Sequence, residues 1–269
     1  MYSNELNNIK CIISDLDGTL LNEEKQLDSE IIPVIQQLKE KGILFTIASG
    51  RNIHIVKDLI EKMNIQIPYI CNNGAEIYNE NSCIYQQYIN NDDHNNVIAM
   101  LIQEKISFLA YTQVALYCFR ETVELINFAK RLNGCCKILY INSKEEVKGI
   151  ISKIVCIPNS DKEGEALISR INTMSKTLFC TQSENEVYTI TSNKATKGEA
   201  LKFLLSALNI SEKNIVVFGD NYNDLSMFEV AHYSVAMENA SIDVKNKANF
   251  ITISNEENGV SYFLKKHLL

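Results

Sequence analysis

Short apolar runs alternate along the chain with longer stretches in which apolar residues recur at helical spacing. Runs at residues 9–13, 43–48 and 69–71 are predicted to be buried strands, because a parallel strand covered on both faces is almost continuously apolar. Residues 29–41 and 52–63 carry their apolar side chains on one face and are predicted to be helices. This alternation predicts an α/β fold with a doubly wound, Rossmann-like parallel sheet and right-handed crossovers.

The pattern changes near Cys83 and changes back near Lys197. Between these points short turns separate neighbouring strand-like runs, which favours antiparallel pairing and an α+β arrangement. Strands are expected near residue 83 and at 108–111, 115–119, 137–141, 153–157, 178–181 and 187–191, and helices at 93–104, 121–132 and 162–175. We therefore expect a core domain formed by residues 1–82 and 192–269, and an inserted α+β domain formed by residues 83–191.

The first pattern resumes after the insert. A helix is predicted at residues 198–208 and a buried strand at 214–218, followed by a helix, a short strand at 234–236 and helices at 241–247 and 260–268. These elements complete the alternation of strands and helices that the first part of the chain begins.

Polar clusters follow three of the predicted core strands directly. They are the segments Asp15-Leu16-Asp17-Gly18-Thr19, Ser49-Gly50-Arg51 and Gly219-Asp220-Asn221-Tyr222-Asn223-Asp224. The carboxyl ends of parallel strands meet at one edge of a sheet, and ligands of open α/β sheets bind there. We therefore expect the three clusters to converge, together with Lys197, which stands just ahead of a core helix.

Composition narrows the possible partners and compartments. The net charge of −7 argues against nonspecific binding to nucleic acids or anionic membranes, which needs a basic surface. No apolar run approaches the roughly 20 residues that span a bilayer, and residues 1–8 lack the apolar core of a signal peptide. The eight cysteines are scattered without a Cys-x-x-Cys pair, which favours a reducing, cytoplasmic location.

The converging residue types suit phosphoryl transfer. Phosphate esters are anionic, so neutralising charge and positioning the reactants supply most of the catalysis. Asp15 and Asp220 can hold one hard cation, and oxygen-only ligands favour Mg²⁺ over zinc. One carboxylate can attack phosphorus while a second moves a proton to or from the leaving oxygen. Asp15-Leu16-Asp17-Gly18 alone could also begin a calcium loop, but the further ligands and the glutamate at the twelfth position are missing.

Four segments, in this order, resemble the motifs of haloacid dehalogenase-like phosphatases. They are Asp15-Leu16-Asp17-Gly18-Thr19, Ser49-Gly50-Arg51, Lys197-Gly198-x-Ala200-Leu201 and Gly219-Asp220-x-x-Asn223-Asp224. The insert falls between the second and third motifs, as it does in the Cof-type branch, which carries a large α/β cap. Two further segments are similar to that branch, Asn72-Asn73-Gly74-Ala75 and Val235-Ala236-Met237-x-Asn239-Ala240.

The resemblance implies a role for each motif residue. Asp15 is the nucleophile and a Mg²⁺ ligand, and Asp17 is the general acid/base, whose backbone carbonyl also meets the metal. Asp220 is a metal ligand, and Asp224 orients Lys197 or a metal-bound water. The groups that hold the phosphoryl group are the Leu16 amide, the Ser49 hydroxyl, the Gly50 amide, the Lys197 ammonium and the Asn223 amide. The role of Arg51 stays open.

These observations predict a Mg²⁺-dependent phosphatase that acts on a small soluble phosphate monoester, such as a sugar phosphate or a phosphorylated cofactor. An aspartyl-phosphate is the expected intermediate, and the inserted domain is expected to close over the sheet edge and supply specificity. A phosphomutase or phosphonate-cleaving relative on the same scaffold is an alternative. A second alternative is a non-catalytic sensor of phosphorylated metabolites, although a pure binder needs no acid/base at Asp17.

Overall fold

The computed structural model describes residues 6, 8–112, 115–130, 137–184 and 186–269. Contacts within the chain divide it into two compact units. One unit comprises Met1–Gln86 and Thr196–Leu269, and we refer to it as the core unit. The other comprises Gln87–Ala195, and we refer to it as the inserted unit. The domain boundaries expected after residues 82 and 191 stay a prediction.

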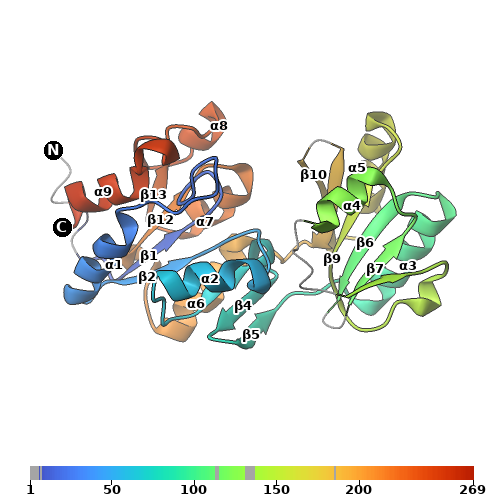
Figure 1. The fold of residues 1–269 in the computed structure, drawn as a ribbon, viewed down its shortest axis with the longest axis horizontal. Helices are drawn as coiled ribbons and strands as arrows, with labels where there is room; N and C mark the ends of the chain where they lie inside the picture. The colour runs from blue at the N-terminus through green and yellow to red at the C-terminus, as the bar shows by residue number, and fades with distance from the viewer. Residues whose placement is uncertain (1–5, 7, 113–114, 131–136, 185) are drawn as a thin grey trace. The chain divides into compact units, whose positions relative to one another are not determined.

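A five-stranded parallel sheet forms the centre of the core unit, with the strand order β14-β13-β12-β1-β2 (Figure 1). Its strands are β1 (Cys11–Ser14), β2 (Leu44–Ile47), β12 (Ile215–Gly219), β13 (Tyr233–Ala236) and β14 (Phe250–Ile251). All four residues of β1 are buried, as the continuous apolar run predicts for a strand covered on both faces. The predicted α/β class with a parallel core sheet is confirmed.

Helices pack on both faces of this sheet. They are α1 (Ile31–Glu40), α2 (Ile53–Lys62), α6 (Lys197–Leu208), α7 (Leu225–Val230), α8 (Ile242–Lys245) and α9 (Gly259–His267). Successive side chains of a strand point to opposite faces, so Ile12 and Ile13 enter different hydrophobic clusters. Ile12 shares its cluster with apolar residues of α1, α2 and α9, and Ile13 shares its own with residues of α6 and α7. The helices on the two faces thus hold in place the sheet whose edge carries the polar clusters.

The third predicted core strand is placed differently. Residues 69–71 form β3 (Tyr69–Cys71), which pairs with β4 (Glu76–Asn79) in a separate antiparallel sheet that also contains β5 (Ser82–Gln86). An isolated parallel bridge between Ala48 and Ile70 joins this sheet to the end of β2. The expectation that β3 is a full member of the parallel sheet is therefore wrong. The strand expected near residue 83 as the start of the insert is β5, which pairs with β4.

The inserted unit contains a six-stranded sheet with the order β10-β11-β9-β6-β7-β8. Its strands are β6 (Ser107–Thr112), β7 (Leu116–Phe119), β8 (Ile138–Tyr140), β9 (Ile151–Ile157), β10 (Leu178–Glu184) and β11 (Val187–Ser192). The strands pair antiparallel as expected, except that β7 and β8 are parallel. This exception arises because α4 (Val123–Lys130) lies between them in the sequence and returns the chain to the same end of the sheet.

Two further helices, α3 (Asn91–Gln103) and α5 (Asp161–Met174), pack with this sheet around a second hydrophobic core. Leu101 of α3 and Leu167 of α5 share that core with Phe108, Ile154 and Ile190 of the strands. Residues 131–132 of the helix predicted at 121–132 lie outside the described residues, as do the adjacent cysteines at 135 and 136. Among the described helices, none is both long enough and apolar enough to span a bilayer.

Candidate active site

The loop after β1 brings Asp15 against the loop after β12. The Asp15 amide donates to the Phe218 carbonyl at 3.0 Å, which continues the pairing of β1 with β12 beyond the strand. The Leu16 carbonyl accepts from the Leu20 and Leu21 amides at 2.9 and 2.8 Å, so the chain turns sharply after Asp15. Gly18 takes part in this turn with φ +81°, and a Cβ on it would lie 2.4 Å from the Asp220 carboxylate. The two loops can therefore approach only because residue 18 is glycine.

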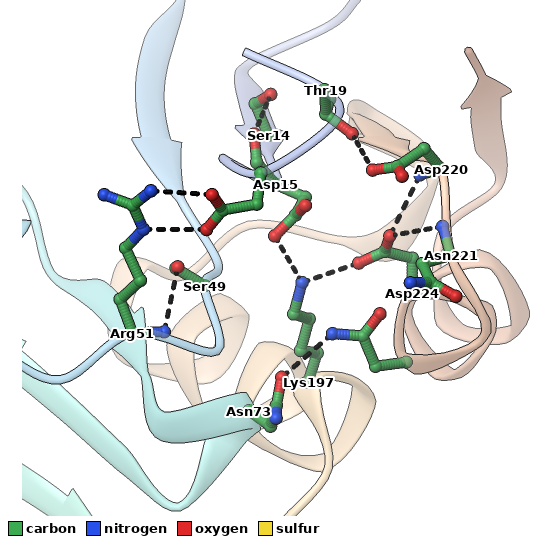
Figure 2. Close-up of polar contacts among 12 residues, drawn as sticks. Ser14, Asp15, Thr19, Ser49, Arg51, Asn73, Lys197, Asp220, Asn221 and Asp224 are labelled. Carbon is green, nitrogen blue, oxygen red and sulfur yellow. Dashed lines mark hydrogen bonds and ion pairs between the residues drawn. The ribbon is translucent and has the colours of Figure 1, made fainter. Parts of the chain in front are cut away.

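Lys197 lies at the centre of the site, between two carboxylates (Figure 2). Its ammonium is 2.5 Å from Asp15 Oδ1 and 2.6 Å from Asp224 Oδ1, and its side chain is fully buried. Burial alone would lower the pKa of Lys197, but the charges of Asp15 and Asp224 outweigh it and raise the pKa above its usual range. The lysine is therefore held as a fixed positive charge next to Asp15.

Asp15, Asp220 and Asp224 form an acidic group whose ligand atoms lie within 4.8 Å of one another. Burial is the main cause that raises the pKa of Asp15 to about 8 and of Asp220 to about 6, and the charge of Asp224 raises both further. Lys197 opposes both increases, and the hydrogen bond from Thr19 opposes that of Asp220. Carboxylates crowded in this way become ionised together when a cation lies between them.

Asp224 is already engaged through both of its oxygens. Oδ1 accepts from Lys197, and Oδ2 accepts from the backbone amides of Asp220 and Asn221 at 3.0 and 3.1 Å. Asp220, by contrast, receives one side-chain hydrogen bond, from the Thr19 hydroxyl to Oδ1 at 2.7 Å. Asp15 and Asp220 are therefore better placed than Asp224 to hold a metal ion, and their oxygen donors fit a hard cation such as Mg²⁺.

Asp17 lies in a different charge environment from Asp15. Arg51 binds it in a bidentate pair, with Nε 2.7 Å from Oδ2 and Nη2 2.6 Å from Oδ1, and Lys25 Nζ lies 3.0 Å from Oδ1. Partial burial favours a higher pKa for Asp17, but the hydrogen bonds and charge of Arg51, assisted by Lys25, lower it below the usual range. The structure thus gives Arg51, whose role the sequence left open, a direct contact with the predicted acid/base.

The predicted phosphoryl-binding residues come from neighbouring loops. Ser49 is fully buried just beyond β2, and its hydroxyl accepts from the Arg51 amide at 3.1 Å. Asn223 lies in the loop after β12, and its side-chain amide donates to Asn73 Oδ1 at 2.9 Å. Leu16 and Gly50 lie in the turns that carry Asp15 and Ser49. Figure 2 shows Ser49, Lys197 and Asp220 gathered around Asp15 at one edge of the sheet.

Three contacts of the site were not anticipated from the sequence. Thr19 binds Asp220, Lys25 binds Asp17, and Asn73 binds Asn223. Lys25 lies in a charged, exposed segment, Glu23-Glu24-Lys25, and no pattern distinguishes it from a solvated surface residue. Asn73 belongs to a segment that the sequence singled out, but the sequence gives no partner for its side chain.

Comparison with known proteins places the whole arrangement in a family. The model of a family described as haloacid dehalogenase-like hydrolases matches residues 12–264, which is nearly the entire chain. The chain belongs to this family. The resemblance carried by the four motifs is therefore confirmed, and so is the Cof-type branch with its inserted α/β cap.

Curated relatives of this haloacid dehalogenase-like hydrolase are named as phosphatases. The chain is 32% identical to 5-amino-6-(5-phospho-D-ribitylamino)uracil phosphatase YwtE of Bacillus subtilis, over 97% of this chain and 98% of the relative. It is 28% identical to phosphatase YwpJ of the same organism, over 97% of this chain and the full length of that relative. The prediction of a phosphatase is confirmed at the level of enzyme class.

A solved structure from Thermotoga maritima has the same fold, with a TM-score of 0.86 and 29% identity over 97% of this chain and 98% of that chain. A haloacid dehalogenase-like hydrolase of B. subtilis gives a TM-score of 0.82 and 28% identity over 97% of this chain and all of that one. The likeness therefore includes the inserted unit as well as the core.

Proposed function

We propose that this phosphatase hydrolyses a small phosphate monoester by a Mg²⁺-dependent reaction that passes through an aspartyl-phosphate on Asp15. The observation that carries the proposal is the position of the Asp15 carboxylate. The Asp15 side chain is 7% exposed, its carboxylate lies 2.5 Å from a buried ammonium, and its ligand atom lies within 4.8 Å of those of Asp220 and Asp224. A solvent-exposed carboxylate in an ordinary turn would need neither contact.

The chain's own groups would divide the work as follows. Lys197, the Ser49 hydroxyl, the Asn223 amide and the backbone amides of Leu16 and Gly50 bind the phosphoryl oxygens. Asp15 and Asp220, with the backbone carbonyl of Asp17, would hold Mg²⁺, which when bound neutralises phosphoryl charge and keeps both carboxylates ionised. The fixed contacts of Asp224 with Lys197 and with two backbone amides keep the lysine aimed at Asp15.

The reaction has two steps, formation of the aspartyl-phosphate and its hydrolysis. In the first, an oxygen of Asp15 bonds to phosphorus, the bond to the leaving oxygen breaks, and Asp17 gives that oxygen a proton. In the second, water attacks the phosphorus, Asp17 takes the proton of the water, and the Asp15 carboxylate leaves with inorganic phosphate as product. The pair with Arg51 favours ionised Asp17, which is the form needed in the second step. For the first step Asp17 must gain a proton, so the pair with Arg51 has to loosen.

The substrate class is a further part of the proposal. A sugar phosphate or a phosphorylated cofactor fits, because a curated relative is named for a phosphate ester of a ribityl-substituted uracil. The six described cysteines are free thiols, four of them in the hydrophobic clusters, which supports a reducing cytoplasm as the site of action. A phosphomutase would transfer the phosphoryl group to a second hydroxyl, so release of free phosphate distinguishes the two reactions.

The test is release of inorganic phosphate from a generic aryl phosphate, with Mg²⁺ and after its removal by a chelator. Release should require Mg²⁺, and Asp15→Asn should lower kcat by about 10,000-fold or more because the nucleophile is lost. Asp58→Asn, which changes an exposed aspartate on α2, is the matched control and should leave the rate unchanged. If Asp15→Asn turned over at the wild-type rate, the assignment of the nucleophile would be wrong.

A further inference from the structure

The turn between β3 and β4 has an unusual backbone. Asn72, Asn73 and Gly74 lie in succession in the left-handed region, with φ of 50°, 55° and 93°. Residues other than glycine and asparagine rarely adopt this backbone conformation. Three consecutive residues with positive φ therefore cost conformational free energy. Backbone strain of this kind persists where the surrounding structure holds it, and it occurs often at functional sites.

The turn is held by the loops of the active site. The Asn73 amide donates to the Ser49 carbonyl at 3.0 Å, and the Asn72 amide donates to the Arg51 carbonyl at 2.9 Å. On its other side, Gly74 packs so closely that a Cβ there would lie 2.0 Å from the Thr196 carbonyl oxygen. The turn therefore joins the loop after β2 to the residue that precedes Lys197.

The side chain of Asn73 reaches a third loop. Its Oδ1 accepts from Nδ2 of Asn223, which comes from the loop after β12. The Asn73 carboxamide also lies against Gly50, where a Cβ would be 2.9 Å from Asn73 Oδ1. Asn223 is exposed, so this hydrogen bond restricts a side chain that otherwise has rotamer freedom.

The backbone of the turn has supports that do not involve the Asn73 side chain. The Asn72 carboxamide donates to Glu76 Oε2 at 2.8 Å, and the Tyr78 hydroxyl donates to the same oxygen at 3.1 Å. Both Asn72 and Glu76 are buried. The turn can thus keep its shape when the Asn73 carboxamide is removed, provided that residue 73 still tolerates a positive φ.

We propose that Asn73 is a positioning residue, which fixes the carboxamide of Asn223 for binding the phosphoryl group. The inference rests on the proposed function, in which Asn223 contacts that group. The Asn73 Oδ1 accepts one N–H of Asn223 Nδ2, which directs the second N–H of that nitrogen and sets the plane of the carboxamide. Because the phosphoryl group is present in both ground and transition states, the contact favours substrate binding more than turnover.

The experiment separates the side chain from the backbone. Asn73→Gly keeps the positive φ and removes the acceptor, whereas Asn73→Ala removes the acceptor and adds strain. If Asn73 positions Asn223, both variants raise the KM for the aryl phosphate about tenfold with little change in kcat, as expected for one lost hydrogen bond. Only Asn73→Ala should also lower the melting temperature. If the residue serves the backbone alone, Asn73→Gly keeps the wild-type KM, which would overturn the proposal.

A double-mutant cycle identifies the partner. Asn223→Ala alone should raise KM, and combining it with Asn73→Gly should add almost nothing, since Asn73 then has no side chain to position. Additive effects would contradict action through Asn223, and so would loss of cooperative unfolding in Asn73→Gly. The matched control is Asn64→Gly. Asn64 also has a positive φ, of 50°, but lies outside the site, so this substitution should leave KM unchanged. A wild-type protein that released no phosphate would instead refute the proposed function.

Discussion

The core unit and the inserted unit organise polar side chains in different ways. In the core unit all strands of the main sheet are parallel, so the loops after β1, β2 and β12 reach the same edge. In the inserted unit most pairs are antiparallel, so successive strand ends alternate between two edges. Among the described residues, the group of three carboxylates that could hold a metal ion lies in the core unit.

Among the described residues of the inserted unit, several polar contacts support turns and helix ends. Asp93 accepts from the hydroxyls of Ser175 and Thr177, and its amide donates to Asn90, the cap of α3. These side chains are exposed or partly exposed, and a local structural role accounts for them. The parallel topology thus brings reactive groups to one edge of the core sheet, whereas the antiparallel pairing of the insert distributes strand ends over two edges.

Among the substitutions that test this comparison, we expect the largest effect at Lys197. Lys197→Met leaves Asp15 and Asp224 buried without their shared countercharge, so the free energy of unfolding should fall by about 3–5 kcal/mol. Phosphate release should fall about 100- to 1,000-fold, as for loss of one preorganised charge at the phosphoryl group. Denaturant unfolding and the aryl phosphate assay measure the two effects.

The control lies on the same helix. Lys202 pairs with Glu199 at the surface, with 59% of its side chain exposed, so Lys202→Met should change stability by less than about 0.5 kcal/mol and leave the rate unchanged. Equal effects of the two substitutions would mean that Lys197 is an ordinary helix residue, which contradicts the proposed site.

Much of the core site could be predicted because its signals are local. An apolar run followed at once by acids or by Ser49-Gly50 marks a strand end, and the parallel topology then brings distant strand ends together. The position of β3 could not be predicted in this way, because three apolar residues do not specify which strand they pair with. Its pairing depends on the left-handed turn at Asn72–Gly74, which reverses the chain into β4.

Contacts between side chains of the site were harder to predict than its backbone. Arg51 follows the Ser49 loop, but only the folded chain shows that its guanidinium faces both oxygens of Asp17. Lys25 reaches the same carboxylate from an exposed loop, where sequence gives no partner. In the insert, the parallel pairing of β7 and β8 depends on the path of α4, which the spacing of apolar residues does not report.

Two helical glycines provide a matched test of the two units. A Cβ on Gly198 of α6 would lie 2.2 Å from the Ser226 carbonyl oxygen, and one on Gly164 of α5 would lie 2.1 Å from the ring of buried Tyr188. Both Gly198→Ala and Gly164→Ala therefore overpack their unit and should cost about 1–3 kcal/mol of unfolding free energy. Only Gly198→Ala should displace Lys197, so only it should lower kcat/KM for an aryl phosphate, by about 100-fold.

This pair sharpens the comparison because the physical change is the same in both units. Calorimetric unfolding measures the stability cost, and steady-state kinetics measures the catalytic one. A loss of kcat/KM in Gly164→Ala as large as in Gly198→Ala would show that the inserted unit takes part in the chemistry itself, against the division that the two sheets suggest.

The smallest expected effect concerns protons in the acidic cluster. Burial raises the pKa of Asp15 to about 8 and that of Asp220 to about 6, above the roughly 3.9 of an unfolded aspartate. The folded, metal-free protein therefore binds more protons than the unfolded chain. Stability from these two groups is present below pH 4 and is lost as the pH rises through 6 and 8.

Mg²⁺ competes with those protons, so its affinity should increase with pH. We expect about a tenfold gain between pH 6.5 and pH 7.5, with release of close to one proton per ion, because tenfold corresponds to one proton displaced over one pH unit. Titration calorimetry in two buffers of different ionisation enthalpy measures both quantities. Asp220→Asn should weaken binding and reduce the proton release, whereas Asp93→Asn in the inserted unit should change neither. An affinity that stayed constant over this range would mean that Mg²⁺ binds away from the buried carboxylates, and the core unit would lose the feature that distinguishes it from the insert.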